Sequence, residues 1–203
     1  ISEFRIPPFI ATLAMMSIAR GLASMITDGS QIIGFPPWFN MSAIIRYGGV
    51  LSATVAVMFI VFLVAYLFQK FRKEGRALYA IGGNPEVARL AGLNVRALTI
   101  FVYSLCGVLS GLAGVLLAAR LDAVQPTIGI AYELDAIAAV VIGGTSLSGG
   151  VGGVVGTIIG VLIIGVLRNG LNLLSVSPFL QAVIIGVVIV LAVAAETLKK
   201  KKA

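Results

Sequence analysis

Residues 97–119 read ALTIFVYSLCGVLSGLAGVLLAA, and this stretch decides the fold. It holds no charged residue and lies between Arg96 and Arg120. As an α-helix it would be about 35 Å long, because each residue adds about 1.5 Å. The hydrocarbon core of a bilayer is about 30 Å thick, so we expect this stretch to span a membrane.

The composition of the whole chain also indicates a membrane protein. Of its 203 residues, 59% are hydrophobic and only 11% are charged, whereas about a quarter are charged in soluble domains. The sequence has no histidine and one cysteine, Cys106, which lies in an apolar run. These counts exclude a water-soluble domain and a disulfide framework, and they disfavour a metal centre or histidine-based catalysis.

Charged residues divide the remaining sequence into further apolar blocks. The expected fold class is therefore all-α, a polytopic bundle of about six transmembrane helices. The expected spans are residues 9–27, 47–68, 97–119, 131–147, 154–171 and 179–195. The block of residues 136–167 is uncharged, but it is too long and too rich in glycine for a single helix.

Basic residues set the expected orientation. They cluster in the loop 69–96 and the tail 196–203, as Lys70, Arg72, Lys73, Arg76, Arg89, Arg96 and Lys199 to Lys202. Cytoplasmic segments carry an excess of Lys and Arg, so both clusters and Arg5 are expected on the cytoplasmic side. An odd number of crossings must then follow the third span, which makes residues 146–153 a cytoplasmic turn. The net charge of +7 thus reflects orientation within one membrane domain over residues 1–203, not nucleic-acid binding.

Glycines recur at helical spacing in two of the expected spans. They are Gly107, Gly111 and Gly114 in the third span, and Gly152, Gly156 and Gly160 in the fifth. Small residues four apart let helices approach closely in a bilayer. Simple bundle packing is the favoured interpretation, and a sliding or gating face is the alternative.

Polar residues are sparse in the spans, and they include Thr145, Asn169 and Asn172. Asn169 and Asn172 are three residues apart, so they share one helix face. Neutral hydroxyls and amides suit a path for an uncharged, hydroxyl-rich solute, but they are also ordinary hydrogen-bond partners between helices. Arg20, also within a span, is expected to face the bundle or to reach toward a membrane surface.

The cytoplasmic loop encodes a short helix with both ends specified. Asn84 is a good N-cap, Pro85 suits the first helical position, and Glu86 favours the positive end of the helix dipole. Gly92 is a natural stop. Val87, Leu90 and Ala91 are expected on one side, and Glu86 and Arg89 on another.

A helix this short is marginal in water, so it needs a surface to pack against. From the residues alone, that surface is either its own membrane domain or a cytosolic partner whose movement the helix transmits.

Several motifs in this order resemble the permease subunits of bacterial ribose-type monosaccharide ABC importers, within the branched-chain amino acid and monosaccharide permease family. They lie at residues 75–93, 125–127, 132–141 and 143–150, with further similarity at 8–13, 169–174 and 177–179. The resemblance covers nearly the whole chain. Members of that family are longer and have some ten spans in a fold like that of type II importers. The chain is thus expected to be the C-terminal two thirds of such a permease.

The resemblance implies a role for the short helix. Glu86, Val87 and Ala88, followed by Gly92, are similar to a coupling motif that docks into a cytosolic ATPase, although Val87 replaces the usual first alanine. The residues implied in coupling are Asn84, Pro85, Glu86, Val87, Ala88, Arg89, Leu90 and Gly92.

The resemblance also implies the partners and the location. ATP and magnesium would be held by the partner ATPase, with no cofactor bound by this chain. An extracytoplasmic sugar-binding protein and a second permease subunit, identical or paralogous, would complete the transporter in the bacterial cell membrane. Glu133 and Asp135 would contact the binding protein or line a gate.

Other functions remain to be weighed. An ATPase is excluded because no Gly-x-x-x-x-Gly-Lys-Ser/Thr sequence occurs. An ion-coupled secondary transporter is the main alternative, but it would need ion ligands or carboxylates within the spans. An intramembrane hydrolase lacks a nucleophile with a positioned base. Relatives that carry branched-chain amino acids or nucleosides also stay open, as does the identity of the sugar.

Overall fold

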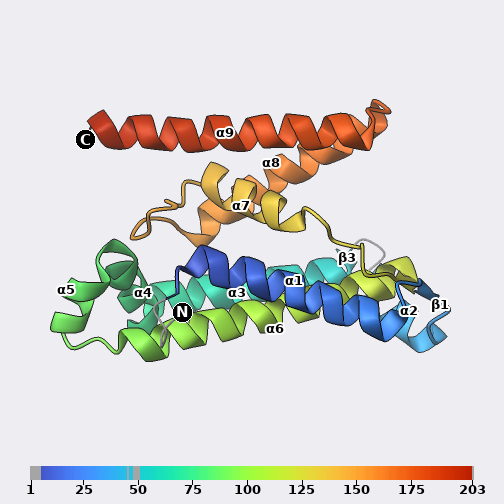
Figure 1. The fold of residues 1–203 in the computed structure, drawn as a ribbon, viewed down its shortest axis with the longest axis horizontal. Helices are drawn as coiled ribbons and strands as arrows, with labels where there is room; N and C mark the ends of the chain where they lie inside the picture. The colour runs from blue at the N-terminus through green and yellow to red at the C-terminus, as the bar shows by residue number, and fades with distance from the viewer. Residues whose placement is uncertain (1–5, 45, 48–50, 203) are drawn as a thin grey trace. The chain divides into compact units, whose positions relative to one another are not determined.

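The computed structural model describes residues 6–44, 46–47 and 51–202, with side chains described at 6–41 and 52–194. Most of the described residues lie in helices (Figure 1). The helices are α1 (Pro8–Thr27), α2 (Pro37–Ile44), α3 (Ala53–Phe71), α4 (Lys73–Gly83), α5 (Pro85–Leu90), α6 (Val95–Leu121), α7 (Tyr132–Ile142), α8 (Val154–Leu173) and α9 (Pro178–Lys202). Two short antiparallel pairs join β1 (Ile32–Ile33) to β4 (Ala123–Val124) and β2 (Arg46–Tyr47) to β3 (Leu51–Ser52).

Four of the described helices, α1, α3, α6 and α8, are long and apolar enough to cross a membrane. The apolar part of α9, Pro178–Ala194, is slightly shorter. A helical, multi-pass membrane protein is therefore confirmed, while the count of six spans is not.

The fourth expected span, residues 131–147, was predicted too long. Its helix, α7, has 11 residues and rises only about 16 Å, which is roughly half the hydrocarbon thickness. The helix ends at Ile142 because Gly144 adopts a left-handed φ of +84°. The amide of Thr145 then donates to the carbonyl of Val140, which closes a Schellman turn.

Other boundaries also differ from the predictions. The second span begins at Ala53 rather than residue 47, because Tyr47 pairs with Leu51 in the β2–β3 ladder. The last helix continues through most of the expected basic tail, as far as Lys202. Helix α2 was not predicted, although Pro37 opens it at a position that suits proline. Arg5 and Ala203 lie outside the described residues.

The chain forms two compact units, which divide within α3 between Ile60 and Val61. The first unit contains α1, α2, the first part of α3, and α6. Within it, Oδ1 of Asp122, at the end of α6, accepts hydrogen bonds from the amide of Phe35 (3.0 Å) and from Nδ2 of Asn40 (2.7 Å). These bonds and the β1–β4 pair fasten the loop before α2 to the end of α6.

The second unit contains the remainder of α3 with α4, α5, α7, α8 and α9. Its buried cluster consists of Ala138, Ala139 and Ile164, and α9 packs against α7. Helices α7 and α8 lie antiparallel, because Gly156 contacts Gly143 whereas Gly160 contacts Ala139. A Cβ at Gly156 or Gly160 would overlap the facing backbone carbonyl.

The six glycines expected at helix contacts thus fall into two groups. Gly152, Gly156 and Gly160 each have a close neighbour, which for Gly152 is the side chain of Thr145. Gly107, Gly111 and Gly114 have open space where a Cβ would lie, among the residues that the structure describes. A packing role for this second group stays a prediction.

Replacing Gly160 by alanine is expected to destabilise the protein. The new methyl group would meet the Ala139 carbonyl, and overpacking of this kind costs about 1–3 kcal/mol. Gly165→Ala in the same helix is the control, because no described atom beyond its own stretch of helix lies within 4 Å of its Cβ position. Thermal melting in detergent is the measurement, and equal melting temperatures for the two variants would contradict this packing.

Candidate functional site

Helix α5 begins with a complete N-cap. Oδ1 of Asn84 accepts hydrogen bonds from the amides of Glu86 (3.0 Å) and Val87 (3.1 Å). Pro85 takes the first helical position, where its missing N–H is no loss. The start of the helix is therefore the one that the sequence predicts.

The end of α5 is a Schellman motif. The amide of Gly92 donates to the carbonyl of Arg89, and the amide of Leu93 donates to that of Ala88, both at about 3 Å. Gly92 has a φ of +82°, a conformation that glycine adopts without strain. The predicted stop at Gly92 is confirmed, and α5 is fixed at both ends.

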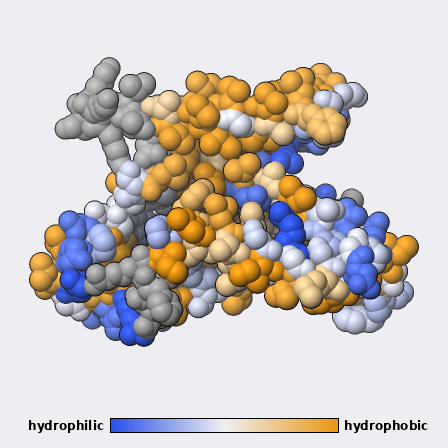
Figure 2. Space-filling view, in the orientation of Figure 1, coloured by the Kyte–Doolittle hydropathy of each residue, from blue (hydrophilic) through white to orange (hydrophobic). Residues whose placement is uncertain are grey.

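The outer surface of α5 combines apolar and charged side chains. Val87 is 59% exposed and Leu90 is 85% exposed, whereas Ala88 is 3% exposed and faces inward. Nη2 of Arg89 lies 2.7 Å from Oε2 of Glu86, so these two charges pair within the helix. Hydrophilic residues surround this end of the second unit, in contrast to the apolar surface of α9 (Figure 2). Val87 and Leu90 are thus two exposed aliphatic side chains on a helix whose charged side chains pair with each other.

A single non-helical residue, Asn84, joins α4 to α5. Its amide donates to the carbonyl of Ala80 at the end of α4, and its carbonyl accepts from the amide of Ala88 in α5. Its side chain caps α5 at the same time. Because all of these groups are bonded, the connection between the two helices is restrained.

The end of α4 rests on the glycine-rich turn between α7 and α8. A Cβ on Gly82 would lie only 2.6 Å from the backbone nitrogen of Gly150, and a Cβ on Gly149 would overlap the carbonyl oxygen of Gly82. The hydroxyl of Tyr79 donates to the carbonyl of Gly152 (2.9 Å). Glycine is required in this turn, where Gly149 has a φ of +87°.

One further hydrogen bond joins α3 to the same place. Oε1 of Gln69 accepts from the amide of Val154, the first residue of α8, at 3.2 Å. The first amides of a helix have no partner within the helix, so Gln69 caps α8 from outside.

An ion pair joins the other ends of α7 and α8. Nη2 of Arg168 lies 2.6 Å from Oδ2 of Asp135, and the side chains are 37% and 18% exposed. The Arg168 guanidinium also lies over the ring of Tyr132, 5.9 Å from its centroid. Oδ1 of Asp135 and Nε of Arg168 are buried without a hydrogen-bond partner among the described residues.

Asp135 is one of five residues that the sequence predicts for a translocation path or gate. The other four, Glu133, Thr145, Asn169 and Asn172, have different surroundings. Glu133 and Asn169 are exposed, and Thr145 packs against Gly152. Oδ1 of Asn172 accepts from Nε2 of the buried Gln181 (2.9 Å), which fastens the turn between α8 and α9. Of the five candidates, only Asp135 is brought to a charged partner in the described part of the chain.

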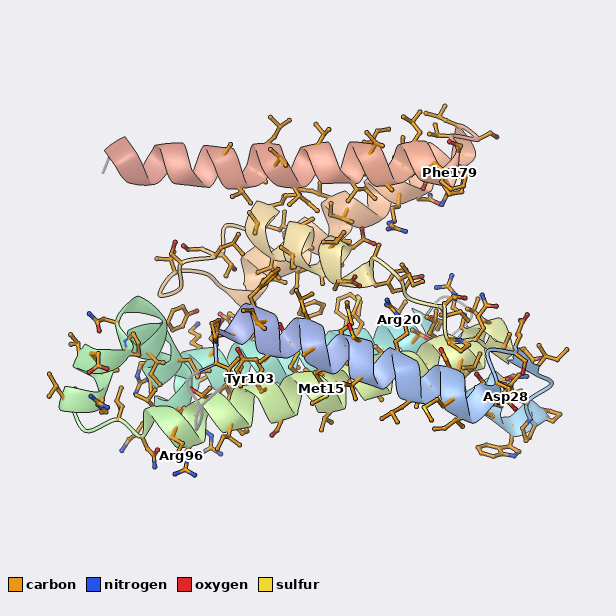
Figure 3. The ribbon with its side chains drawn as sticks, in the orientation of Figure 1. Met15, Arg20, Asp28, Arg96, Tyr103 and Phe179 are labelled. Atoms are coloured by element: carbon orange, nitrogen blue, oxygen red, sulfur yellow. The ribbon has the colours of Figure 1, made fainter. Side chains whose placement is uncertain are left out.

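A groove of about 490 Å³ lies between α1 and α6 in the first unit. Met15 on α1 and Tyr103 on α6, both labelled in Figure 3, are among its lining residues. The hydroxyls of Thr12 and Thr99 are bonded to carbonyls of their own helices. Tyr103 and Ser104 are the other hydroxyl groups at this groove, and sequence reasoning did not name Tyr103.

Comparison with known proteins identifies the family. Residues 1–193 match the family described as branched-chain amino acid transport system, permease component. The chain belongs to this permease family. No solved structure matches it.

The similar permeases include several named for sugars. The chain is 48% identical to the ribose import permease protein RbsC of Escherichia coli strain K12, over 98% of the chain and 63% of that protein. It is also 48% identical to RbsC of Bacillus subtilis strain 168, over 95% of the chain and 60% of the relative. The chain is 39% identical to the L-arabinose transport system permease protein AraH of E. coli K12, over 99% of the chain and 61% of that protein. The chain thus spans about three fifths of the length of these relatives.

Sequence reasoning found the short helix of this permease but missed Arg168 as a site residue. A lone arginine near the end of an apolar run signals a need for a partner, yet the sequence does not say which acid supplies it. The contact of Tyr79 with the glycine turn was likewise not predicted.

The ion pair of this permease predicts unequal effects for two neighbouring acids. Asp135→Ala removes the partner of Arg168, and a hydrogen bond between charged groups contributes about 1.5–3 kcal/mol. Glu133→Ala, in the same first turn but exposed, is the control, because both carboxylates have the same favourable interaction with the helix dipole. The melting temperature is expected to fall more for Asp135→Ala and to recover partly in Asp135→Ala/Arg168→Leu, which removes the unpaired charge. Equal melting of the two single variants would refute the pairing.

Proposed function

We propose that this chain is part of the permease subunit of an ATP-driven importer for a ribose-type monosaccharide. The permease would form the path through the membrane, and a separate cytosolic ATPase would bind ATP and magnesium. A sugar-binding protein outside the membrane and a second permease subunit would complete the assembly. Membership of the permease family and the ribose and arabinose names of similar proteins support this proposal.

The observation that carries the proposal is α5. It is capped at both ends, it is joined stiffly to α4, and it presents Val87 and Leu90 to the surroundings. An exposed apolar pair on a rigid helix suits a hydrophobic groove on another protein. The resemblance of residues 86–92 to the coupling motif makes an ABC ATPase the proposed partner.

The path would serve a neutral solute. Asp135, one of two acids in the first turn of α7, is paired with Arg168, so its charge is already balanced by a cation of the chain itself. This pairing favours an ATP-driven permease over the ion-coupled alternative. Glu133 is exposed at the start of α7, and we propose that it contacts the external sugar-binding protein.

The proposed orientation places both ends of this chain segment in the cytoplasm. Its support is the contact of the turn at Gly149 and Gly150 with Gly82, which belongs to the loop that carries α5. If α5 docks on a cytosolic ATPase, this turn is cytoplasmic as well. Helix α8 then leads outward over about 30 Å, which is enough to cross the hydrocarbon core.

Cysteine labelling tests this orientation. In a Cys106→Ala background, Ser148→Cys is expected to react with a membrane-impermeant maleimide only from the cytoplasmic side, and Gln125→Cys only from outside. Each variant serves as the other's control in right-side-out and inverted vesicles. Labelling of both positions from one side would remove the proposed orientation.

Substitution of Leu90 tests the docking of α5. Leu90→Glu is expected to weaken co-purification of the ATPase by about tenfold or more, since an exposed apolar anchor would lose its pocket. Lys73→Gln in α4 is the control, because it changes the net charge by the same amount at another exposed position of the same loop.

Leu90 makes few contacts within its own chain, so its substitution is expected to leave the melting temperature of the permease unchanged. Normal recovery of the ATPase and normal sugar-stimulated hydrolysis with Leu90→Glu would contradict the proposed role of α5.

A further inference from the structure

We propose that Gly82, Gly149 and Tyr79 form a mechanical joint that passes the movement of α5 to the α7–α8 pair. This inference rests on the proposed function, because it assumes that α5 is moved by an ATPase. It goes further by naming the residues that carry the movement away from the docking surface. These residues contact no nucleotide or solute, so they are positioning residues.

The first component of the joint is direct contact between the backbone at the end of α4 and the backbone of the turn between α7 and α8. Gly82 and Gly149 meet without any side chain between them, and Gly150 lies against the backbone of Gly83, with its Cβ position 3.0 Å from the Cα of that residue. A contact between two backbones cannot be relaxed by a change of rotamer. Displacement of α4 at this point must therefore displace the turn.

The second component is directional. The hydrogen bond from Tyr79 to the carbonyl of Gly152 holds the turn to α4 when the two are pulled apart, whereas the glycine contacts resist compression. Gln69 adds a bond from the end of α3 to the first amide of α8. The joint can thus transmit movement in both directions.

Both sides of the joint are stiff. On one side, Asn84 fixes α5 to α4 through its amide, its carbonyl and its side chain. On the other side, the contacts of Gly143 with Gly156 and of Ala139 with Gly160 hold α7 against α8. Gly149 itself lies in the non-helical connection of residues 143–153, which hydrogen bonds at Ser146 and the bond from Gln69 to Val154 hold in place. A shift of α5 would therefore reach the two helices through this restrained connection.

A pair of adjacent glycines gives a matched test in the assembled transporter. Gly82→Ala places a methyl group against the backbone of Gly150, whereas Gly83→Ala, the control, has open space at its Cβ position. Both changes lie in the last turn of α4, so their effects on helix propensity are similar. In proteoliposomes, the readout is the amount of sugar transported per ATP hydrolysed, together with recovery of the ATPase.

Gly82→Ala is expected to keep the ATPase bound and hydrolysing while transport per ATP falls about 2- to 30-fold, the range for substitutions along a coupling network. Gly83→Ala is expected to behave as the unmodified protein. Tyr79→Phe provides a second, isosteric variant, which removes only the hydroxyl bonded to Gly152. Its control is Tyr66→Phe, whose hydroxyl accepts from Lys70 instead. Tyr79→Phe is expected to lower transport per ATP within the same range.

The outcomes separate this inference from the proposed function. Unchanged transport per ATP in Tyr79→Phe, or in a folded Gly82→Ala, would overturn the joint and leave the docking of α5 intact. Failure of the unmodified permease to recruit any ATPase would overturn both. If Gly82→Ala does not fold, Tyr79→Phe decides alone.

Discussion

Contact between backbones at glycine residues is the constraint on which the second unit depends. In a bilayer, burial of apolar side chains brings little net gain, because lipid tails are equally apolar. Close approach of helices must then supply the dispersion energy, and it requires positions without a Cβ. Gly143, Gly156 and Gly160 provide such positions between α7 and α8, and Gly82 and Gly149 continue the same principle into the loop. The buried cluster is accordingly small, with alanine as its main constituent.

Hydrogen bonds and an ion pair hold α7 and α8 at the two ends of their glycine contacts. The turn after α7 is closed by hydrogen bonds around Ser146, and the start of α8 is capped by Gln69. At the other end of the α7–α8 pair, the ion pair of Arg168 with Asp135 holds the two helices together in place of small residues. Hydrogen bonds and charges are directional and expensive to leave unpaired in this environment. They therefore fix the register of helices that apolar packing alone would allow to slide.

The sequence predicts local features, such as helix caps, better than it predicts contacts between residues that are far apart in the chain. Asn84, Pro85 and Gly92 define α5 because capping depends on residues within one turn of each other. The long spans follow from the distance between charges, which the bilayer thickness sets. The length of α7 could not be predicted in the same way, because the uncharged block gives no boundary and Gly143 and Gly144 break the helix within it. The pairing of Arg168 with Asp135, and the contact of Gly82 with Gly149, depend on a fold that brings residues 33 and 67 positions apart together.

The two ends of α8 are held by different kinds of contact. At its start, close backbone contacts and a cap bind it to the segment that carries α5. About 21 Å further along the helix axis, Arg168 is held by an ion pair in which Nε of Arg168 and Oδ1 of Asp135 have no partner among the described residues. Backbone contacts resist closer approach because no side chain between them can move aside, whereas an ion pair acts through charge and is costly to break in an apolar environment. Helix α8 is thus held by steric contact near its start and by charge near its end, and both kinds of contact limit how far it can shift against α7.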